Sequence, residues 1–176
     1  MSRITTPASI TTSPAAAQPL LEAVQQQLGS VPNLFRVITL EGYLGFSAAL
    51  GKGALSLKTR NRIAVLVAEL NQCDYCLSAH TYLGKHAAKL DDTELSANRD
   101  ASSEDAQAMA ALRFARKLVV ERGRVTPADV EAVKAAGYTD AQLVEIVAHV
   151  ALNTFTNYLN VAVDTAVDFP LVTHRS

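Results

Sequence analysis

The sequence predicts an all-α fold, and three observations support this prediction. Apolar residues recur at spacings of three and four rather than two along nearly the whole chain. Capping residues, prolines and glycines stand at the ends of these apolar segments. About half of the 176 residues (49%) are apolar, which is enough for the core of one domain.

The N-terminal half divides into an arm and a series of helices. Residues 1–18 are rich in Thr, Ser, Ala and Pro, so we expect an extended arm followed by one helical domain over residues 19–176. Pro19 suits the first turn of a helix, and Gly29 suits its end. The helices that follow are expected over residues 33–40, 41–50, 57–70 and 74–89.

Capping signals also place the helices of the C-terminal half. Gly137 suits the end of one helix. Thr139 and Gln142 form the pattern of a capping box, which opens a long final helix to about Ala166. We expect helices to begin near Asp91, at Ser102 or Ser103, at Thr126 and at Thr139.

Composition excludes several classes of function. The net charge is −1 and Lys and Arg do not cluster, which argues against nucleic-acid and anionic-membrane partners. The N-terminus lacks the apolar run of a signal peptide, and no stretch is long enough to span a bilayer. A secreted disulfide scaffold would contain more than two cysteines. We therefore expect a soluble cytoplasmic protein.

The segment that carries chemistry contains both cysteines. Cys73 and Cys76 are separated by two residues, with His80 four residues later and Glu69 four residues earlier. A free thiol has a pKa of about 8.5, and a nearby base or a helix N-terminus promotes the thiolate. A second thiol within reach can then close a disulfide, so the segment predicts a redox site.

Two local geometries are compatible with this spacing. On an uninterrupted helix, the four side chains form one stripe. A break at Asn71-Gln72 is favoured, because Asn is a poor residue inside a helix. The cysteines then occupy the first turn of a new helix, where free N–H groups lower a thiol pKa. In that arrangement we expect Cys73 to be exposed and Cys76 to lie nearer His80.

These residues suggest distinct chemical roles. His80 can accept a proton from Cys76, and the Cys76 thiolate can attack an electrophilic oxygen or sulfur. Cys73 can resolve the resulting sulfenic acid into a disulfide. Glu69 can orient His80 or relay its proton. The chemistry requires no haem, flavin or metal.

Two readings without redox chemistry compete. The cysteines could be small core residues of an amphipathic helix. They could also bind zinc together with His80 and either His86 or Glu69. A structural zinc site normally takes ligands from two separated elements, and the sequence has no second cysteine pair.

Three further residues are candidates for the pocket. His149 lies in an apolar stretch, where it is either a core histidine or a residue facing Cys76. Tyr75 either shapes the pocket or packs at a subunit contact. Asn157 belongs to a polar stripe on the last predicted helix, which reads as a solvated face or as helix–helix hydrogen bonds. The stripe consists of Asn153, Asn157, Asn160 and Asp164.

The chain resembles the AhpD-like alkylhydroperoxidases of the carboxymuconolactone decarboxylase superfamily, and in particular their peroxidase-related branch. The signature phrase is Ala68-Glu-Leu-Asn-Gln-Cys73-Asp-Tyr-Cys76-Leu-Ser-Ala-His80-Thr81. Agreement continues downstream, so that the resemblance covers roughly residues 20–170. The downstream segments are 114–118, 136–138, 145–147, 155–158 and 168–170.

The resemblance implies an all-helical domain that assembles into dimers, trimers or hexamers and reduces peroxide through the cysteine pair. The cysteine matching Cys76 attacks the peroxide, the one matching Cys73 resolves, and the histidine matching His80 belongs to a proton relay. The relay glutamate of the family's best-studied type falls twelve residues before the first cysteine, and this chain has Asn61 there. Glu69 is the carboxylate typical of the peroxidase-related branch.

We therefore expect a thiol-dependent hydroperoxide reductase, an oxidoreductase that an external dithiol regenerates. The dithiol would be a thioredoxin-like protein or a lipoyl-type group. One alternative is a general thiol–disulfide oxidoreductase. Another is a helical oligomer that senses redox state without catalysis.

Overall fold

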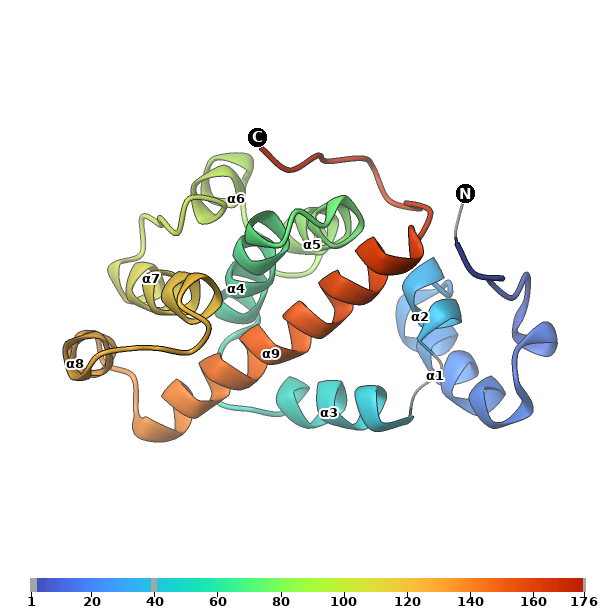
Figure 1. The fold of residues 1–176 in the computed structure, drawn as a ribbon, viewed down its shortest axis with the longest axis horizontal. Helices are drawn as coiled ribbons and strands as arrows, with labels where there is room; N and C mark the ends of the chain where they lie inside the picture. The colour runs from blue at the N-terminus through green and yellow to red at the C-terminus, as the bar shows by residue number, and fades with distance from the viewer. Residues whose placement is uncertain (1–2, 39–40, 176) are drawn as a thin grey trace.

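A computed structural model describes residues 3–38 and 41–175 (Figure 1). Within these ranges every regular element is a helix, which confirms the all-α prediction. Two 3-10 helices come first, η1 (Ile10–Thr12) and η2 (Ala15–Ala17). The α-helices are α1 (Gln18–Leu28), α2 (Asn33–Val37), α3 (Glu41–Gly51), α4 (Leu57–Leu70), α5 (Asp74–His86), α6 (Asp92–Asn98), α7 (Ala106–Val120), α8 (Pro127–Ala135) and α9 (Asp140–Val163).

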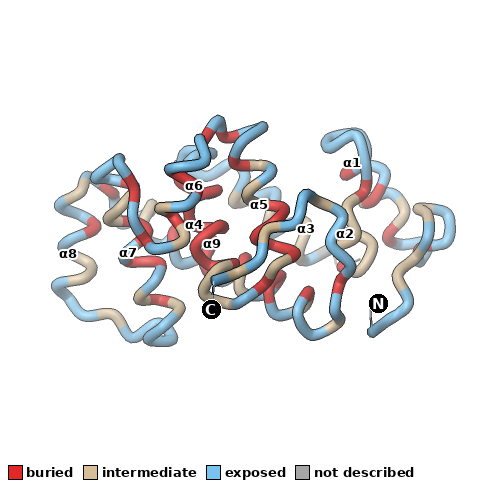
Figure 2. Tube along the Cα trace, turned by 90° about the horizontal axis from the view of Figure 1, so that it is seen from above, coloured by how far each residue is buried: buried red, intermediate tan, exposed pale blue. Residues whose placement is uncertain are grey.

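Helix α4 lies at the centre of the molecule and packs against α5, α7 and α9. Its apolar side chains Ile63, Leu66 and Val67 join the larger core cluster with residues of α7 and α9. Val65 and Ala68 instead join a second cluster that contains both cysteines. Buried residues gather on α4, α5 and α9, whereas the N-terminal arm is mostly exposed (Figure 2). The cysteine segment is therefore built into the interior.

Most helix ends follow the local signals in the sequence. Helix α1 ends at Gly29, whose φ of 75° is the left-handed conformation that glycine adopts without strain. Helix α4 has the predicted bounds. Thr126 and Thr139 both close capping boxes, with Asp129 and Gln142 respectively.

Four helix boundaries differ from the predictions. Helix α7 begins at Ala106 instead of Ser102 or Ser103, because the Asp105 carboxylate caps it and Ser103 donates its hydroxyl to Glu94. Helix α5 ends at His86, before Lys89. Helix α9 ends at Val163, because Asp164 takes the left-handed conformation. Helix α2 ends at Val37, before the predicted end at residue 40, because Ile38 leaves the helical conformation with a ψ of 80°.

The last described residues, 165–175, form a segment that we call the C-terminal strap. The strap leaves the end of α9 and passes over α5 towards α6 (Figure 1). Ser78 of α5 receives a hydrogen bond from Val172 N at 2.9 Å and donates one to Val172 O at 3.3 Å. Further along the strap, His174 bonds to Asp74 and the backbone N–H of Arg175 donates to Glu69. The strap thus fastens to the elements that carry the cysteines.

Candidate active site

The two cysteines lie at the start of α5, after a break in the helical path. Asn71 ends α4, Gln72 has a φ of 54°, and Cys73 is the N-cap residue of α5. The Cys73 sulfur accepts a hydrogen bond from the Cys76 backbone N–H at 3.4 Å. The break at Asn71-Gln72 and the position of the pair in the first turn therefore agree with the favoured geometry.

Both cysteines are free of a disulfide bond, and both are buried. Cys73 is 1% exposed and Cys76 is 2% exposed. The prediction that Cys73 is exposed is therefore wrong. Cys73 packs into the second apolar cluster, against which Phe169 and Val172 of the C-terminal strap also lie.

The sulfur atoms have unequal surroundings. Asn160 of α9 donates from its Nδ2 to the Cys76 sulfur at 3.2 Å. A hydrogen bond from Cys73 and those of Asn160 and Asn157 lower the pKa of Cys76 against the opposing effect of burial. The same interaction with Cys76, together with burial, raises the pKa of Cys73. Cys76 is therefore the more acidic thiol of the pair, and Cys73 is the thiol that donates to it.

His80 lies one turn beyond Cys76 on α5 and is half-buried. Burial lowers the pKa of His80 to about 4, against the opposing effect of a hydrogen bond with the Asn153 side chain of α9. The imidazole is therefore neutral at pH 7 and able to accept a proton.

Asn61, at the position where the resemblance implies a glutamate, lies on α4 beside the His80 backbone. Its Nδ2 donates to the His80 carbonyl oxygen at 3.1 Å. A Cβ at Gly84 would lie 2.7 Å from the Asn61 Oδ1, so the lack of a side chain there lets α4 and α5 approach closely. Asn61 thus supports the backbone of α5 rather than the imidazole.

Glu69 makes different contacts from those expected. Its Oε2 pairs with Arg99 Nε at 2.5 Å, and its Oε1 accepts from the Arg175 N–H at 2.7 Å. Both side chains of the ion pair are nearly buried. Glu69 therefore ties α4 to the loop after α6 and to the C-terminal strap, and among the described residues its carboxylate contacts these two partners rather than His80.

Of the three predicted pocket residues, only the Asn157 side chain lies beside the Cys76 sulfur. Asn157 is fully buried and lies beside Cys76. The Tyr75 hydroxyl accepts a hydrogen bond from Leu34 N at 3.0 Å, and its ring packs on Phe169 at 5.9 Å. Tyr75 therefore joins α5 to α2 and to the strap, which is a structural position.

His149 lies on α9, about three turns before Asn160, which is the residue that contacts Cys76. Its Nε2 is 3.7 Å from Glu145 Oε1, and burial lowers the pKa of His149. Glu145 in turn accepts hydrogen bonds from the N–H groups of Ala54 and Leu55, which begin the connection to α4. These contacts match the core reading of His149.

Two residues of the site were not predicted. Asn160 was noticed as a member of the polar stripe, and its donation to Cys76 shows that the stripe faces the sulfur. Tyr43 of α3 had no signal in the sequence. Burial and the charge on Cys76 raise the pKa of Tyr43 to about 12, against a hydrogen bond with Ser47. Tyr43 is therefore within electrostatic range of the thiolate.

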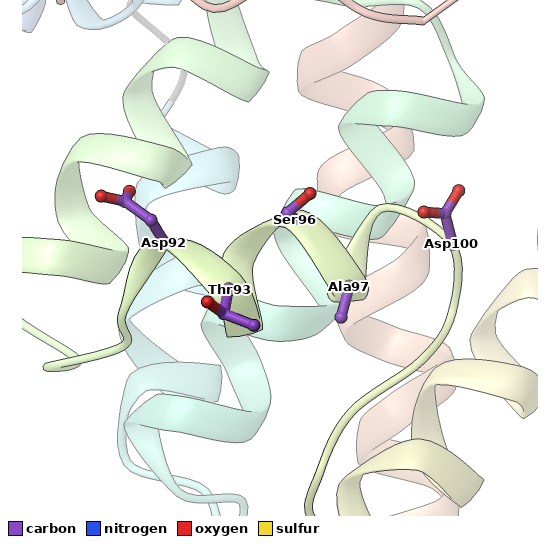
Figure 3. A pocket seen from close by; sticks show the side chains of 5 residues that line it. All are labelled: Asp92, Thr93, Ser96, Ala97 and Asp100. Carbon is purple, nitrogen blue, oxygen red and sulfur yellow. The ribbon is translucent and has the colours of Figure 1, made fainter.

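Other regions of the described chain offer little chemistry. No group of three or more His, Cys, Asp or Glu side chains among these residues is placed to hold a metal ion. A hollow of about 500 Å³ lies on α6, away from the cysteines, and Figure 3 shows the five side chains that line it. Its carboxylates Asp92 and Asp100 are already paired with Lys85 and Arg175. None of the helices in residues 3–38 and 41–175 has the length and apolarity to cross a bilayer.

Comparison with known proteins identifies relatives of this arrangement. Residues 39–117 match the profile of the carboxymuconolactone decarboxylase family. A structure described as an alkylhydroperoxidase AhpD core, an uncharacterized peroxidase-related protein from Ralstonia eutropha, is 26% identical with a TM-score of 0.84. The match covers 95% of this chain and 92% of that one.

Two more structures share the fold over nearly the whole chain. A peroxidase-related protein from a Silicibacter species is 26% identical with a TM-score of 0.80, and the match covers 94% of this chain and 91% of that one. The debrominase Bmp8, crystallised as a variant with 2,3,4-tribromopyrrole, is 19% identical with a TM-score of 0.77 over 96% and 94% of the two chains. No curated protein sequence matches this chain.

Proposed function

The chain belongs to the AhpD-like carboxymuconolactone decarboxylase superfamily, and from this premise we propose that it is a thiol-dependent hydroperoxide reductase. The observation that carries the proposal is the inequality of the two sulfurs. Cys76 accepts donors that favour its thiolate, and Cys73 remains a thiol beside it. A nucleophile with a resolving thiol in contact is what peroxide reduction through a sulfenic acid needs.

The proposed reaction has two steps. Cys76 gives its proton to neutral His80, its thiolate attacks one peroxide oxygen, the O–O bond breaks, and the leaving alkoxide takes that proton back from His80. Cys73 then attacks the sulfenic sulfur of Cys76 and loses its proton. The released hydroxide takes that proton and leaves as water. Two thiols and one hydroperoxide thus become one disulfide, one alcohol and one water.

We assign the proton-accepting role to His80 and a structural role to Glu69. A histidine with a pKa of about 4 is ready to accept a proton at pH 7, although the low pKa makes it a weak base. The carboxylate of Glu69 is occupied by Arg99 and by the strap. This division differs from the relay expected from the sequence.

The burial of both sulfurs favours a small substrate over a protein disulfide. Exposed fractions of 1% and 2% leave no surface on which another folded protein could present its disulfide to Cys76. A hydroperoxide needs far less room. For the same reason, the external dithiol that regenerates the pair needs an opening near Cys73, and its identity as a thioredoxin-like or lipoyl-type partner stays a prediction.

We further propose that the protein forms a homo-oligomer through the outer face of α9. The inner face of α9 packs on α4, yet five large apolar residues lie on the other side. A helix that is apolar on both faces is normally covered on both. The exposed residues are Val144, Val147, Phe155, Tyr158 and Val161.

Peroxide consumption with a dithiol reductant tests the proposed reaction. We expect the native protein to consume cumene hydroperoxide over many cycles and Cys76→Ser to lose this activity. In Cys73→Ser, one equivalent of peroxide should leave a sulfenic acid on Cys76 that dimedone traps and mass spectrometry locates. Full activity in Cys76→Ser, or no Cys73–Cys76 disulfide in the oxidised protein, would overturn the proposal. A single oxidation without turnover would instead indicate a redox sensor.

A further inference from the structure

The Cys76 sulfur lies against a set of buried amides on α9. Asn160 Nδ2 donates to this sulfur at 3.2 Å, and Asn160 is 3% exposed. The Asn160 Oδ1 is buried without a hydrogen-bond partner. A buried polar atom without a partner has a free-energy cost, so the amide is kept in the core at the expense of stability. Contact between its N–H and Cys76 is the feature that explains its position.

Asn157 provides a second amide with a fixed orientation. Its Oδ1 accepts a hydrogen bond from Asn71 Nδ2 at 3.0 Å, and Asn71 is the residue that ends α4. Its Nδ2 is buried, and the interaction of this amide with Cys76 lowers the pKa of Cys76. The break before α5 therefore fixes both the cysteine pair and the amide that faces it.

Thr156 has the smallest effect of the α9 side chains that lower the pKa of Cys76. Its hydroxyl lies in the same buried region, but it donates to the Asn153 carbonyl oxygen at 2.9 Å. The hydroxyl proton is therefore already used, and the two asparagines remain as the N–H donors that α9 offers to Cys76.

The main groups acting on Cys76 are neutral. Cys73, Asn160 and Asn157 all lack a charge when they donate, and His80, the nearest base on α5, is neutral at pH 7. A thiolate is often stabilised by an imidazolium or by a basic side chain. At Cys76, amide dipoles take the place of a positive charge in stabilising the thiolate, and they act strongly because the site is buried.

We propose that Asn160 is a catalytic residue that stabilises the Cys76 thiolate as a neutral hydrogen-bond donor, with Asn157 as the second donor behind it. This inference rests on the proposed function for its role in turnover, but the thiolate itself can be measured without peroxide. Because neither donor titrates, Cys76 stays reactive across the pH range in which an imidazolium would lose its proton.

Alkylation of the full-length reduced protein with iodoacetamide tests the proposal. The rate at Cys76 is followed from pH 5 to pH 10 by peptide mass spectrometry, which separates it from Cys73. Asn160→Ala should raise the pH midpoint by about one unit, which makes alkylation below the midpoint about tenfold slower. Asn160→Asp places a carboxylate of the same shape against the thiolate, so it should raise the midpoint further.

Two controls separate this effect from loss of the fold. Thr154→Ala changes a half-buried residue of the same helix outside the amide set, and it should leave the midpoint unchanged. Asn160→Ser keeps a short hydrogen-bond donor and replaces Asn160→Ala if that variant fails to fold. Its pH midpoint for Cys76 alkylation should lie between the midpoints of the native protein and of Asn160→Asp. The inference would be overturned if the midpoint of Cys76 is unchanged in folded Asn160→Asp and also in folded Asn160→Ala or Asn160→Ser.

Peroxide turnover distinguishes this result from the proposed function. If the midpoints shift as expected but the native protein does not consume peroxide, the amides stabilise the thiolate and the proposed reaction is wrong. If peroxide is consumed and the midpoints do not shift, the reaction stands and the role assigned to Asn160 is overturned.

Discussion

At the scale of single residues, position on α5 makes two chemically identical side chains different. Cys73 is the N-cap residue and packs among apolar side chains, whereas Cys76 lies one turn further and meets the amides of α9. A thiolate is more stable where donors converge on it. Their positions on α5 thus give the two sulfurs unequal surroundings, which is the basis for the roles proposed for them.

His80 makes the stability of the protein depend on pH. Its folded pKa of about 4 lies below the usual 6.5, so between these pH values the unfolded chain binds a proton that the folded chain does not. Its contribution is complete above pH 6.5 and is lost as the pH falls towards 4. The free energy of unfolding should fall in both proteins when the pH is lowered from 7 to 4. We expect the fall to be about 2 kcal/mol smaller in His80→Gln than in the native protein.

Urea unfolding at both pH values measures this difference. His149 has a lowered pKa for the same reason, burial, and remains in both proteins, so its contribution cancels in the comparison. Equal losses in the native protein and in His80→Gln would show that His80 has an ordinary pKa.

Glu69→Gln separates the structural role of Glu69 from a role in proton relay. Removing the charge leaves Arg99 without its partner in a nearly buried pair, so we expect a loss of about 2 kcal/mol in the free energy of unfolding. Peroxide consumption at 25 °C and pH 7 should stay within about twofold of native. Arg99→Met provides the matched control, because combining it with Glu69→Gln should recover part of the lost stability. A tenfold loss of activity in a stable Glu69→Gln protein would return Glu69 to the relay.

At the scale of elements, the C-terminal strap covers the start of α5. Its contacts reach residues on both sides of Cys73, through Glu69, Asp74 and Ser78. Phe169 and Val172 add apolar contact with the cysteine cluster. The low exposure of Cys73 therefore depends on a segment almost one hundred residues away in the sequence.

Weakening the strap should expose Cys73. In Phe169→Ala/Val172→Ala the apolar contacts are lost, and we expect a bulky thiol reagent to label Cys73 at least about tenfold faster, because local opening of the strap becomes easier. Leu171→Ala is the control, since Leu171 is 65% exposed on the same segment. Labelling followed by peptide mass spectrometry measures both. Native-like labelling in the double variant would mean that the strap does not limit access to Cys73.

At the scale of the whole molecule, the outer face of α9 is a surface that the described chain covers only in part, through Tyr43 of α3 beside Phe155. A lysine at position 144 or 158 would be buried without a partner in an oligomer but solvated in a monomer. We expect Val144→Lys/Tyr158→Lys to lower the molar mass measured by light scattering to that of one chain. Val120→Lys, at a 57% exposed position at the end of α7, should keep the native mass. A monomeric native protein would contradict the proposed interface.

Helices and their ends were predictable because their causes are local. Thr126, Thr139 and Gly29 act within one turn of their own positions, and the break at Asn71-Gln72 follows from the same kind of signal. The start of α7 was missed for the opposite reason. The Ser103 hydroxyl donates its hydrogen bond to Glu94 of α6, so Asp105 is the residue that caps α7.

The sequence by itself determined the helical fold, the location of the cysteine pair at a helix start and the position of His80 one turn beyond Cys76. These depend on capping, periodicity and spacing over a few residues. Only the tertiary structure decided that Cys73 is buried, that Glu69 pairs with Arg99 and that Asn160 faces Cys76. Each of these contacts joins segments far apart in the chain, and the packing of α4, α5, α9 and the strap brings them together.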